Sequence, residues 1–152
     1  FTALHGEPPA STYATPDLRN AHPVLDFDAS TAESQCFSGV LPRNYAGGGL
    51  TVYLHWMAST ATSGNVVWGT AIERMNTDLD SDSFAAQQTA TTACNGTSGI
   101  IATSSIGHTS GSQMDSLAAG EPYRLQVQRV AASGSDTMAG DAELVAIEIK
   151  ET

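Results

Sequence analysis

Short stretches in which apolar and polar residues alternate run through most of this 152-residue chain, and they constrain its fold more than any other feature. The clearest spans residues 50–58, where Val52, Leu54 and Trp56 fall on one side. A period of two residues is that of an extended strand with one buried face. Stretches with a helical period are almost absent. The pattern therefore predicts an all-β protein.

The end of the chain carries the strongest local signal for a pair of strands. Residues 123–128 and 144–150 both alternate, and residues 133–141 between them are rich in Gly, Ser and Asp. Two alternating runs joined by such a turn predict a β-hairpin. We expect this hairpin to close a β-sandwich.

Six further stretches bring the number of expected strands to about eight. They lie between turns rich in Gly, Pro and Ser and comprise residues 23–28, 35–41, 50–58, 66–72, 87–93 and 100–106. Many short strands at close spacing are typical of antiparallel sandwiches and barrels, and eight strands in two sheets favour a jelly roll. Trp56 and Trp68 are in phase with the inward-facing aliphatic residues, so we expect both in the core.

Residues 1–22 differ from the rest of the chain. Pro8, Pro9 and Pro16 disfavour helix and regular strand there, so we expect an extended N-terminal arm followed by a sandwich domain over residues 23–152. Such an arm is either a disordered terminus or a segment that docks on a neighbouring subunit. The apolar residues with which a docked arm would make its contacts are Phe1, Leu4, Tyr13 and Leu18.

Composition excludes several classes of partner. Charged residues are 14% of the chain, below the roughly 25% of typical soluble domains. Six basic against sixteen acidic residues give a net charge of −10, which argues against binding to nucleic acid or to anionic membranes. No apolar stretch is long enough for a transmembrane helix. A surface of low charge favours a secreted or assembled protein, so we expect an extracellular or virion-associated location.

The two cysteines, Cys36 and Cys94, leave two alternatives open. Neither belongs to a C-x-x-C pair or a Cys/His cluster, so a zinc site is not indicated. They are either two buried free thiols or one structural disulfide. A disulfide would imply an oxidising compartment.

Three carboxylates alternate at Asp78, Asp80 and Asp82, as they do in many calcium loops. An EF-hand loop needs Gly at its sixth position and Glu at its twelfth, where this chain has Ser83 and Thr89. The segment is therefore not an EF-hand loop. A looser calcium site in a sandwich loop and a solvated acidic loop are the two alternatives left, and we predict no cofactor.

The sequence contains no pattern that indicates catalysis. The G-x-S-x-G, H-E-x-x-H and P-loop motifs are all absent, and no Ser has a base at a recognisable spacing. The scattered Glu residues do not form a readable pair of glycosidase carboxylates. We therefore expect a protein that is not an enzyme.

Two features could involve carbohydrate. Asn95, Gly96 and Thr97 form an N-x-T sequon in an expected turn, where Asn95 could carry an N-linked glycan. Tyr45 lies in a Gly-rich loop and is the aromatic residue best placed to stack on a bound sugar. Glycans are accordingly an alternative class of partner.

Several of the strand and turn segments resemble a group of small jelly-roll structural proteins encoded by phages and uncultured bacteria. The matching pieces are residues 23–28, 48–56, 64–68 and 136–142. The resemblance implies a β-sandwich that assembles with copies of itself, on a virion or in an extracellular fibre. It brings no catalytic residues, and residues 1–22 lie outside it.

These observations lead to one expected function and one alternative. We expect a non-enzymatic structural subunit that forms a homo-oligomer or helical filament through its sandwich and its N-terminal arm. Addition of a strand to a neighbouring sheet supplies main-chain hydrogen bonds at an edge that is otherwise exposed. The alternative is a carbohydrate- or receptor-binding module of a phage tail.

Overall fold

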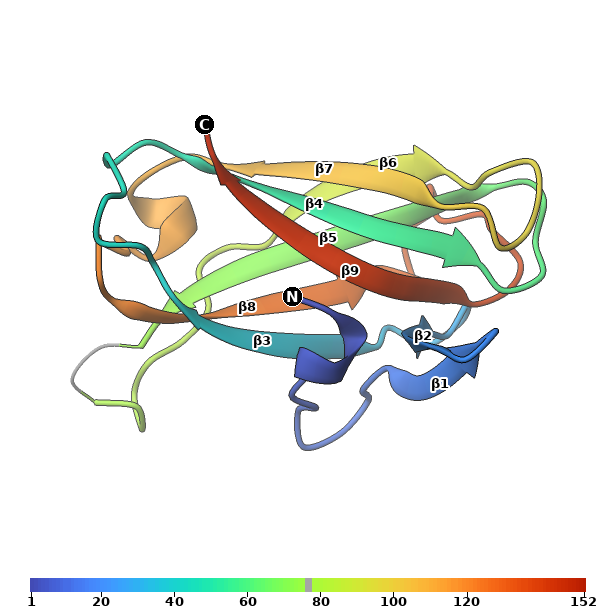
Figure 1. Ribbon diagram of the computed structural model, residues 1–152, viewed down its shortest axis with the longest axis horizontal. Helices are drawn as coiled ribbons and strands as arrows, with labels where there is room; N and C mark the ends of the chain where they lie inside the picture. The colour runs from blue at the N-terminus through green and yellow to red at the C-terminus, as the bar shows by residue number, and fades with distance from the viewer. Residues whose placement is uncertain (76–77) are drawn as a thin grey trace.

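The computed structural model describes residues 1–75 and 78–152, which form a sandwich of two antiparallel β-sheets (Figure 1). One sheet has the strand order β1-β2-β9-β4-β7 and the other β3-β8-β5-β6. The strands are β1 (Thr15–Arg19), β2 (His22–Phe27), β3 (Ser34–Val40), β4 (Leu50–Ala58), β5 (Asn65–Arg74), β6 (Gln88–Ala93), β7 (Ala102–His108), β8 (Pro122–Arg129) and β9 (Ala142–Glu151).

The two sheets have the topology of a jelly roll. The order β2-β9-β4-β7 in one sheet faces β3-β8-β5-β6 in the other, which is the arrangement of two interleaved Greek keys. This confirms the predicted antiparallel jelly-roll sandwich. Strand β1 is an additional strand at the edge of the larger sheet. The only helical pieces in the described residues are two short 3-10 turns, η1 (Ala3–His5) and η2 (Ser112–Met114), and neither could cross a membrane.

The predicted closing hairpin is wrong. Strand β8 pairs with β3 and β5 in one sheet, whereas β9 pairs with β2 and β4 in the other. The connection over residues 130–141 therefore crosses from one sheet to the other. It is longer than the loops that join the strands of most hairpins. Strands β8 and β9 each pair with strands that are distant in sequence. A local turn pattern carries no information about such pairing.

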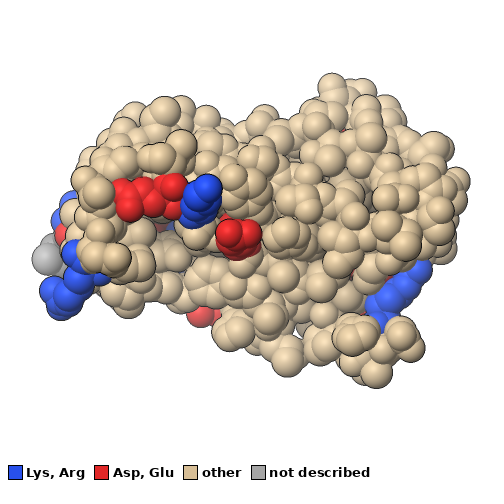
Figure 2. All heavy atoms as spheres, turned by 45° about the horizontal axis from the view of Figure 1, so that its top comes forward, with Lys and Arg blue, Asp and Glu red and all other residues tan. Residues whose placement is uncertain are grey.

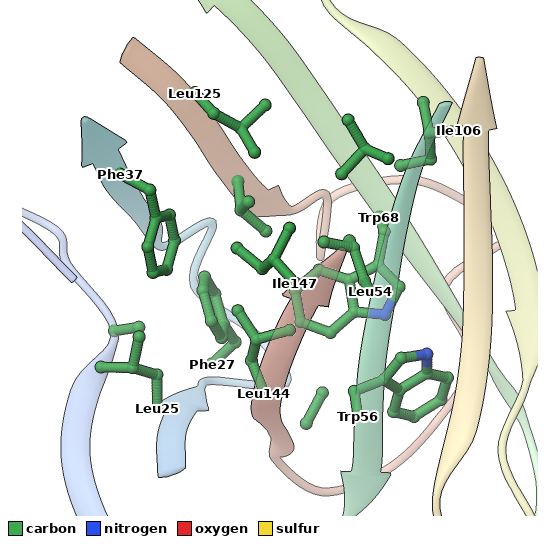
Figure 3. Close-up of a cluster of buried hydrophobic side chains, with 14 of the residues drawn as sticks. Leu25, Phe27, Phe37, Leu54, Trp56, Trp68, Ile106, Leu125, Leu144 and Ile147 are labelled. Atoms are coloured by element: carbon green, nitrogen blue, oxygen red, sulfur yellow. The ribbon is translucent and has the colours of Figure 1, made fainter. Parts of the chain in front are cut away.

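The core lies between the sheets and is built from the alternating residues (Figure 3). Trp56 and Trp68 are fully buried, as predicted, and their ring centroids are 5.9 Å apart with the planes at 62°. Phe27 packs edge-on against Trp68 at 5.0 Å. Edge-to-face contacts of this kind add to the stabilisation from burial. The Trp56 indole N–H donates to Ser104 Oγ at 2.8 Å, so the ring is buried without losing its hydrogen bond.

A buried arginine holds the crossing between β8 and β9. Arg129 is fully buried and pairs with the Asp136 carboxylate at 2.8 Å. It also donates to the main-chain oxygens of Phe27, Met138 and Gly140, at 3.3, 2.8 and 2.7 Å. The guanidinium donors are thus satisfied inside the fold, as a buried charge requires. These bonds fix the long connection against the end of the sandwich.

The N-terminal region contains a strand that we did not expect. Residues 15–19 form β1, which pairs with β2 along its whole length. Asn20 and Ala21 between the two strands both have positive φ, 48° and 63°, as in the two-residue turns that join hairpin strands. Pro16 is tolerated because β1 is an edge strand, where one missing N–H leaves no ladder bond unmade.

We predict that Asp136→Ala lowers the free energy of unfolding by about 3–5 kcal/mol, because it leaves the Arg129 charge buried without its partner. The matched control is Glu121→Ala, which breaks the more exposed Arg74–Glu121 pair and should cost about 1 kcal/mol or less. Urea unfolding at pH 7 measures both. Equal losses in the two variants would contradict the role given to Arg129.

Candidate functional site

The start of the chain occupies a strand position beside β9. The Phe1 nitrogen donates to the Ile147 oxygen at 2.8 Å, and the Ile147 N–H donates to the Phe1 oxygen at 2.9 Å. Thr2 continues this pairing opposite Ala146. Strand β2 pairs with β9 only as far as Leu144. The first two residues therefore take the place that β2 leaves vacant in the larger sheet.

The chain then crosses to the free edge of the smaller sheet. The Glu7 N–H donates to the Cys36 oxygen at 2.8 Å, and the Cys36 N–H donates to the Glu7 oxygen at 3.0 Å. The Ser34 N–H donates to the Thr12 oxygen at 3.0 Å. These bonds cover the outer edge of β3, which would otherwise present unpaired main-chain groups. We call residues 1–7, which reach both sheets, the docking segment.

Some side chains of the N-terminal region complete the core. The Phe1 ring is partly buried and lies 5.7 Å from the Phe37 ring, centroid to centroid. Ala3 and Ala14 are buried in the same core. The docking segment thus closes the seam between the two sheets on the side where β3 is the outermost strand (Figure 1).

The other apolar side chains of this region are exposed. Leu4 is 78% exposed, Leu18 66% and Tyr13 46%. In the register of β1 and β2, Leu18 lies opposite Pro23, and Pro16 lies opposite Leu25, which is a core residue. Pro16 and Leu18 therefore point to the core side of the larger sheet. Because five strands face four, no strand of the smaller sheet within residues 1–75 and 78–152 lies across from β1 to cover them.

These residues line two hollows that share Leu4 and Pro16, and Tyr13 lies in the second of them. A shallow hollow of about 360 Å³ runs between η1, β1 and the start of β2, and Leu4, Pro16 and Leu18 contribute to its lining. We call Leu4, Tyr13, Pro16 and Leu18 the apolar patch. Of the four residues predicted to make arm contacts, Phe1 packs into the sandwich, and Leu4, Tyr13 and Leu18 are available to another molecule.

The two cysteines are free thiols. Cys36 is in β3 and Cys94 follows β6, so they lie at opposite edges of the four-stranded sheet. Neighbouring strands are about 4.8 Å apart, and three such steps exceed the span of a disulfide. The disulfide alternative is therefore wrong for a bond within one chain. Burial raises the pKa of the Cys36 thiol.

The acidic stretch forms a local turn. The Asp78 carboxylate accepts from the Asp80 N–H at 3.2 Å, and the Asp78 main-chain oxygen accepts from the N–H groups of Ser81 and Asp82 at 3.1 and 3.2 Å. Over residues 1–75 and 78–152, no three His, Cys, Asp or Glu side chains are grouped so that they could hold a metal ion. The calcium alternative thus finds no ligand set in this part of the chain.

The two carbohydrate candidates occupy different places. Tyr45 is partly buried in a hollow that it lines together with Asn44, Tyr123 and Glu151, and its hydroxyl donates to the Gly48 oxygen. Asn95 is exposed in the loop after β6, where its Oδ1 accepts from the Thr97 N–H at 3.2 Å. Tyr45 is thus partly accessible from this hollow, and Asn95 is exposed.

Comparison with known proteins gives no family. No family model and no curated protein matches the chain. One solved structure that resembles it is that of an arabinose-bound α-L-arabinofuranosidase, with 11% sequence identity and a TM-score of 0.48. The match covers 95% of this chain and 23% of that one, so this chain spans less than a quarter of the enzyme.

The main-chain contacts of Glu7 and Thr12 could not be predicted from the sequence. Both residues act through backbone N–H and C=O groups, which every residue carries, so side-chain type gives no signal. The apolar side chains of the region were the available signal. They do not distinguish a residue that docks, such as Phe1, from one that stays exposed, such as Leu4.

We predict that the two kinds of apolar residue contribute differently to stability. Phe1→Ala removes a partly buried ring from its contact with Phe37 and should lower the free energy of unfolding by about 1–2 kcal/mol. The double variant Leu4→Ser, Leu18→Ser changes exposed side chains and should change it by about 0.5 kcal/mol or less. Urea unfolding of dilute protein tests this. A loss in the double variant as large as that in Phe1→Ala would show that the apolar patch is part of the core.

Proposed function

We propose that this chain is a non-enzymatic structural subunit that assembles with copies of itself into an extracellular helical fibre or a virion-associated assembly. The observation that supports this most is the way the docking segment is attached. Main-chain bonds of Phe1 and Glu7 hold it to strand edges of both sheets, and the apolar patch beside it is left exposed. In the proposed assembly, the docking segment of one copy fills the seam of the next.

Such an exchange costs few contacts, because a segment from another copy can make the same bonds in the same seam. The link between the docking segment and β1 is suited to a hinge. Residues 8, 10, 11 and 12 are exposed, and Pro8 and Pro9 favour an extended path. Residues 8–11 span at most about 14 Å when extended. Only a copy in direct contact is within reach, which brings the apolar patch into the junction.

An exchange that runs from each copy to the next is head-to-tail. Such a contact gives a filament when its rotation does not close into a ring. The face shown in Figure 2 carries few charged side chains, so copies that pack there would meet little local repulsion. The net charge of −10 opposes association at longer range, and salt screens that repulsion.

The histidines also support a structural role, because two of them form hydrogen bonds with threonine side chains of other strands. His108 is buried and joins Thr70 Oγ1 through Nε2 at 2.8 Å, and burial lowers its pKa. His55 Nδ1 lies 3.2 Å from Thr103 Oγ1 on the neighbouring strand. These contacts hold strands together and need no substrate to explain them.

A disulfide between the docking segment and β3 tests the proposal. Glu7 and Cys36 are direct cross-strand partners, so their Cβ atoms are about 5 Å apart, and a small shift of this edge segment brings a cysteine at position 7 within disulfide distance of Cys36. We predict that Glu7→Cys in a Cys94→Ser background, oxidised at high protein concentration, gives a ladder of covalent multimers on denaturing gels without reductant. Reduction should collapse the ladder to the monomer.

The matched control is Cys94→Ser alone, in which Cys36 is the one remaining thiol and is buried, so no ladder should form. If the Glu7→Cys protein is fully oxidised but runs only as a monomer, the docking segment lies on its own sandwich and the exchange is refuted.

The hollow beside Tyr45 favours a second candidate function, that of a carbohydrate- or receptor-binding module. An aromatic face next to Asn44 and Glu151 offers both stacking and hydrogen bonding to a sugar. Binding of the monomer to a glycan array, with loss of that binding in Tyr45→Ala, would support this function. A monomer that binds no glycan would refute this second function.

A further inference from the structure

Two carboxylates lie directly opposite each other where β2 meets β9. Asp26 of β2 pairs in register with Glu143 of β9. Side chains in such positions have Cβ atoms about 5 Å apart, and like charges there repel. Glu143 is buried and forms an ion pair with Arg19 of β1 at 2.8 Å. Among the residues that the structure describes, Asp26 has no such partner, and its Oδ1 is buried without a hydrogen bond.

The charges around Asp26 are mostly negative. Burial first, and then Glu143, Asp141 and Asp17, raise the pKa of Asp26 from 3.8 to about 6, against the opposing effect of Arg19. The other titratable residues on the same side of β2 are His22 and Asp28; hydrogen bonds from Ser30 and Thr31 lower the pKa of Asp28 to about 2, so it stays ionised. These acids do not form a group that could hold a metal among the described residues. A proton on Asp26 would relieve the repulsion that Arg19 leaves.

This carboxylate pair sits at a mechanically weak point. The ladder between β2 and β9 has three residue pairs, Leu25–Leu144, Asp26–Glu143 and Phe27–Ala142, and the two carboxylates are in the middle one. In the part of the chain that the structure describes, β1 pairs with β2 and with no other strand of its sheet. The β1–β2 hairpin, with Leu18 of the apolar patch, is therefore joined to the larger sheet by this short ladder, by the hydrogen bonds of Arg19 to Glu143 and to the Ser59 oxygen, and by the buried side chains of Leu25 and Phe27.

We propose that the Asp26–Glu143 pair is a proton-operated latch for the β1–β2 hairpin. With a proton on Asp26, its O–H donates to the Glu143 carboxylate and holds β2 on β9. When the proton leaves, two adjacent carboxylates share one arginine and the hairpin loosens. The hairpin adjoins the docking segment, so the latch would lock the seam in mild acid and free it for exchange near neutral pH. That consequence rests on the proposed function, but the latch itself does not.

The sign of the pH dependence follows from the raised pKa. The folded protein binds the Asp26 proton more tightly than the unfolded chain does, so the proton stabilises the hairpin fully below about pH 4. This stabilisation is lost as the pH rises from about 4 through about 6. The net effect near neutrality is a hairpin that opens more often than the rest of the sheet.

Hydrogen exchange of the dilute monomer, corrected for the intrinsic effect of pH, tests the latch. Between pH 5 and pH 7.5 we expect protection of the Leu25 and Phe27 amides to fall by up to about tenfold, because pH 5 lies one unit below the folded-state pKa of about 6 and each unit contributes roughly a factor of ten. The Val52 and Leu54 amides of β4 are the internal control and should not change. In Asp26→Asn, protection of β2 should stay high at both pH values.

The latch would be overturned if protection of the β2 amides fell equally in Asp26→Asn between pH 5 and pH 7.5. It would also be overturned if protection did not fall in the unaltered protein. If Asp26→Asn does not fold, carbon-13 NMR titration of the Asp26 carboxyl in the unaltered protein decides instead. A midpoint near 6 supports the latch, and a midpoint near 4 refutes it. Both measurements use monomer, so a negative result leaves the exchange of docking segments to be judged by the Glu7→Cys disulfide.

Discussion

An unpaired strand edge beside the core is the constraint around which this structure is arranged. Strand β3 ends the smaller sheet, and β2 leaves β9 after three residue pairs, so main-chain groups of both sheets would be open along one seam. Unpaired edges invite pairing with another chain. Phe1, Thr2 and Glu7 cover both edges here. Whichever molecule supplies that segment, the sandwich is complete only when the seam is filled.

Much of the fold could be predicted from the alternation of residues, because each strand buries one face and the two tryptophans follow that period. The pairing of the strands could not be predicted, since it depends on contacts between residues that are distant in sequence. Residues 123–128 and 144–150 read as a hairpin, yet β8 and β9 lie in different sheets. Pro16 was a reason to expect no strand, although an edge position makes it harmless in β1.

The candidate site was predictable only in part. Leu4, Tyr13 and Leu18 could be named from the sequence because they are apolar in a Pro-rich segment. The exposure of Leu18 follows from five strands facing four, and that of Leu4 and Tyr13 from the path of the chain before β1; only the structure shows either. Asp26 reads in the sequence as an ordinary outward residue of a strand. Its unusual environment arises because the register places Glu143, distant in sequence, directly opposite it.

The seam, the apolar patch and the carboxylate pair lie together on β1, β2 and the start of the chain, and this clustering is the basis of the assembly account. The most direct test is an electron cryomicroscopy reconstruction of assembled material that resolves the path of residues 7–14. The account predicts that the chain passes through residues 8–11 into the seam of the adjoining copy. A chain that returns to its own seam, or protein that stays monomeric at high concentration, would contradict it.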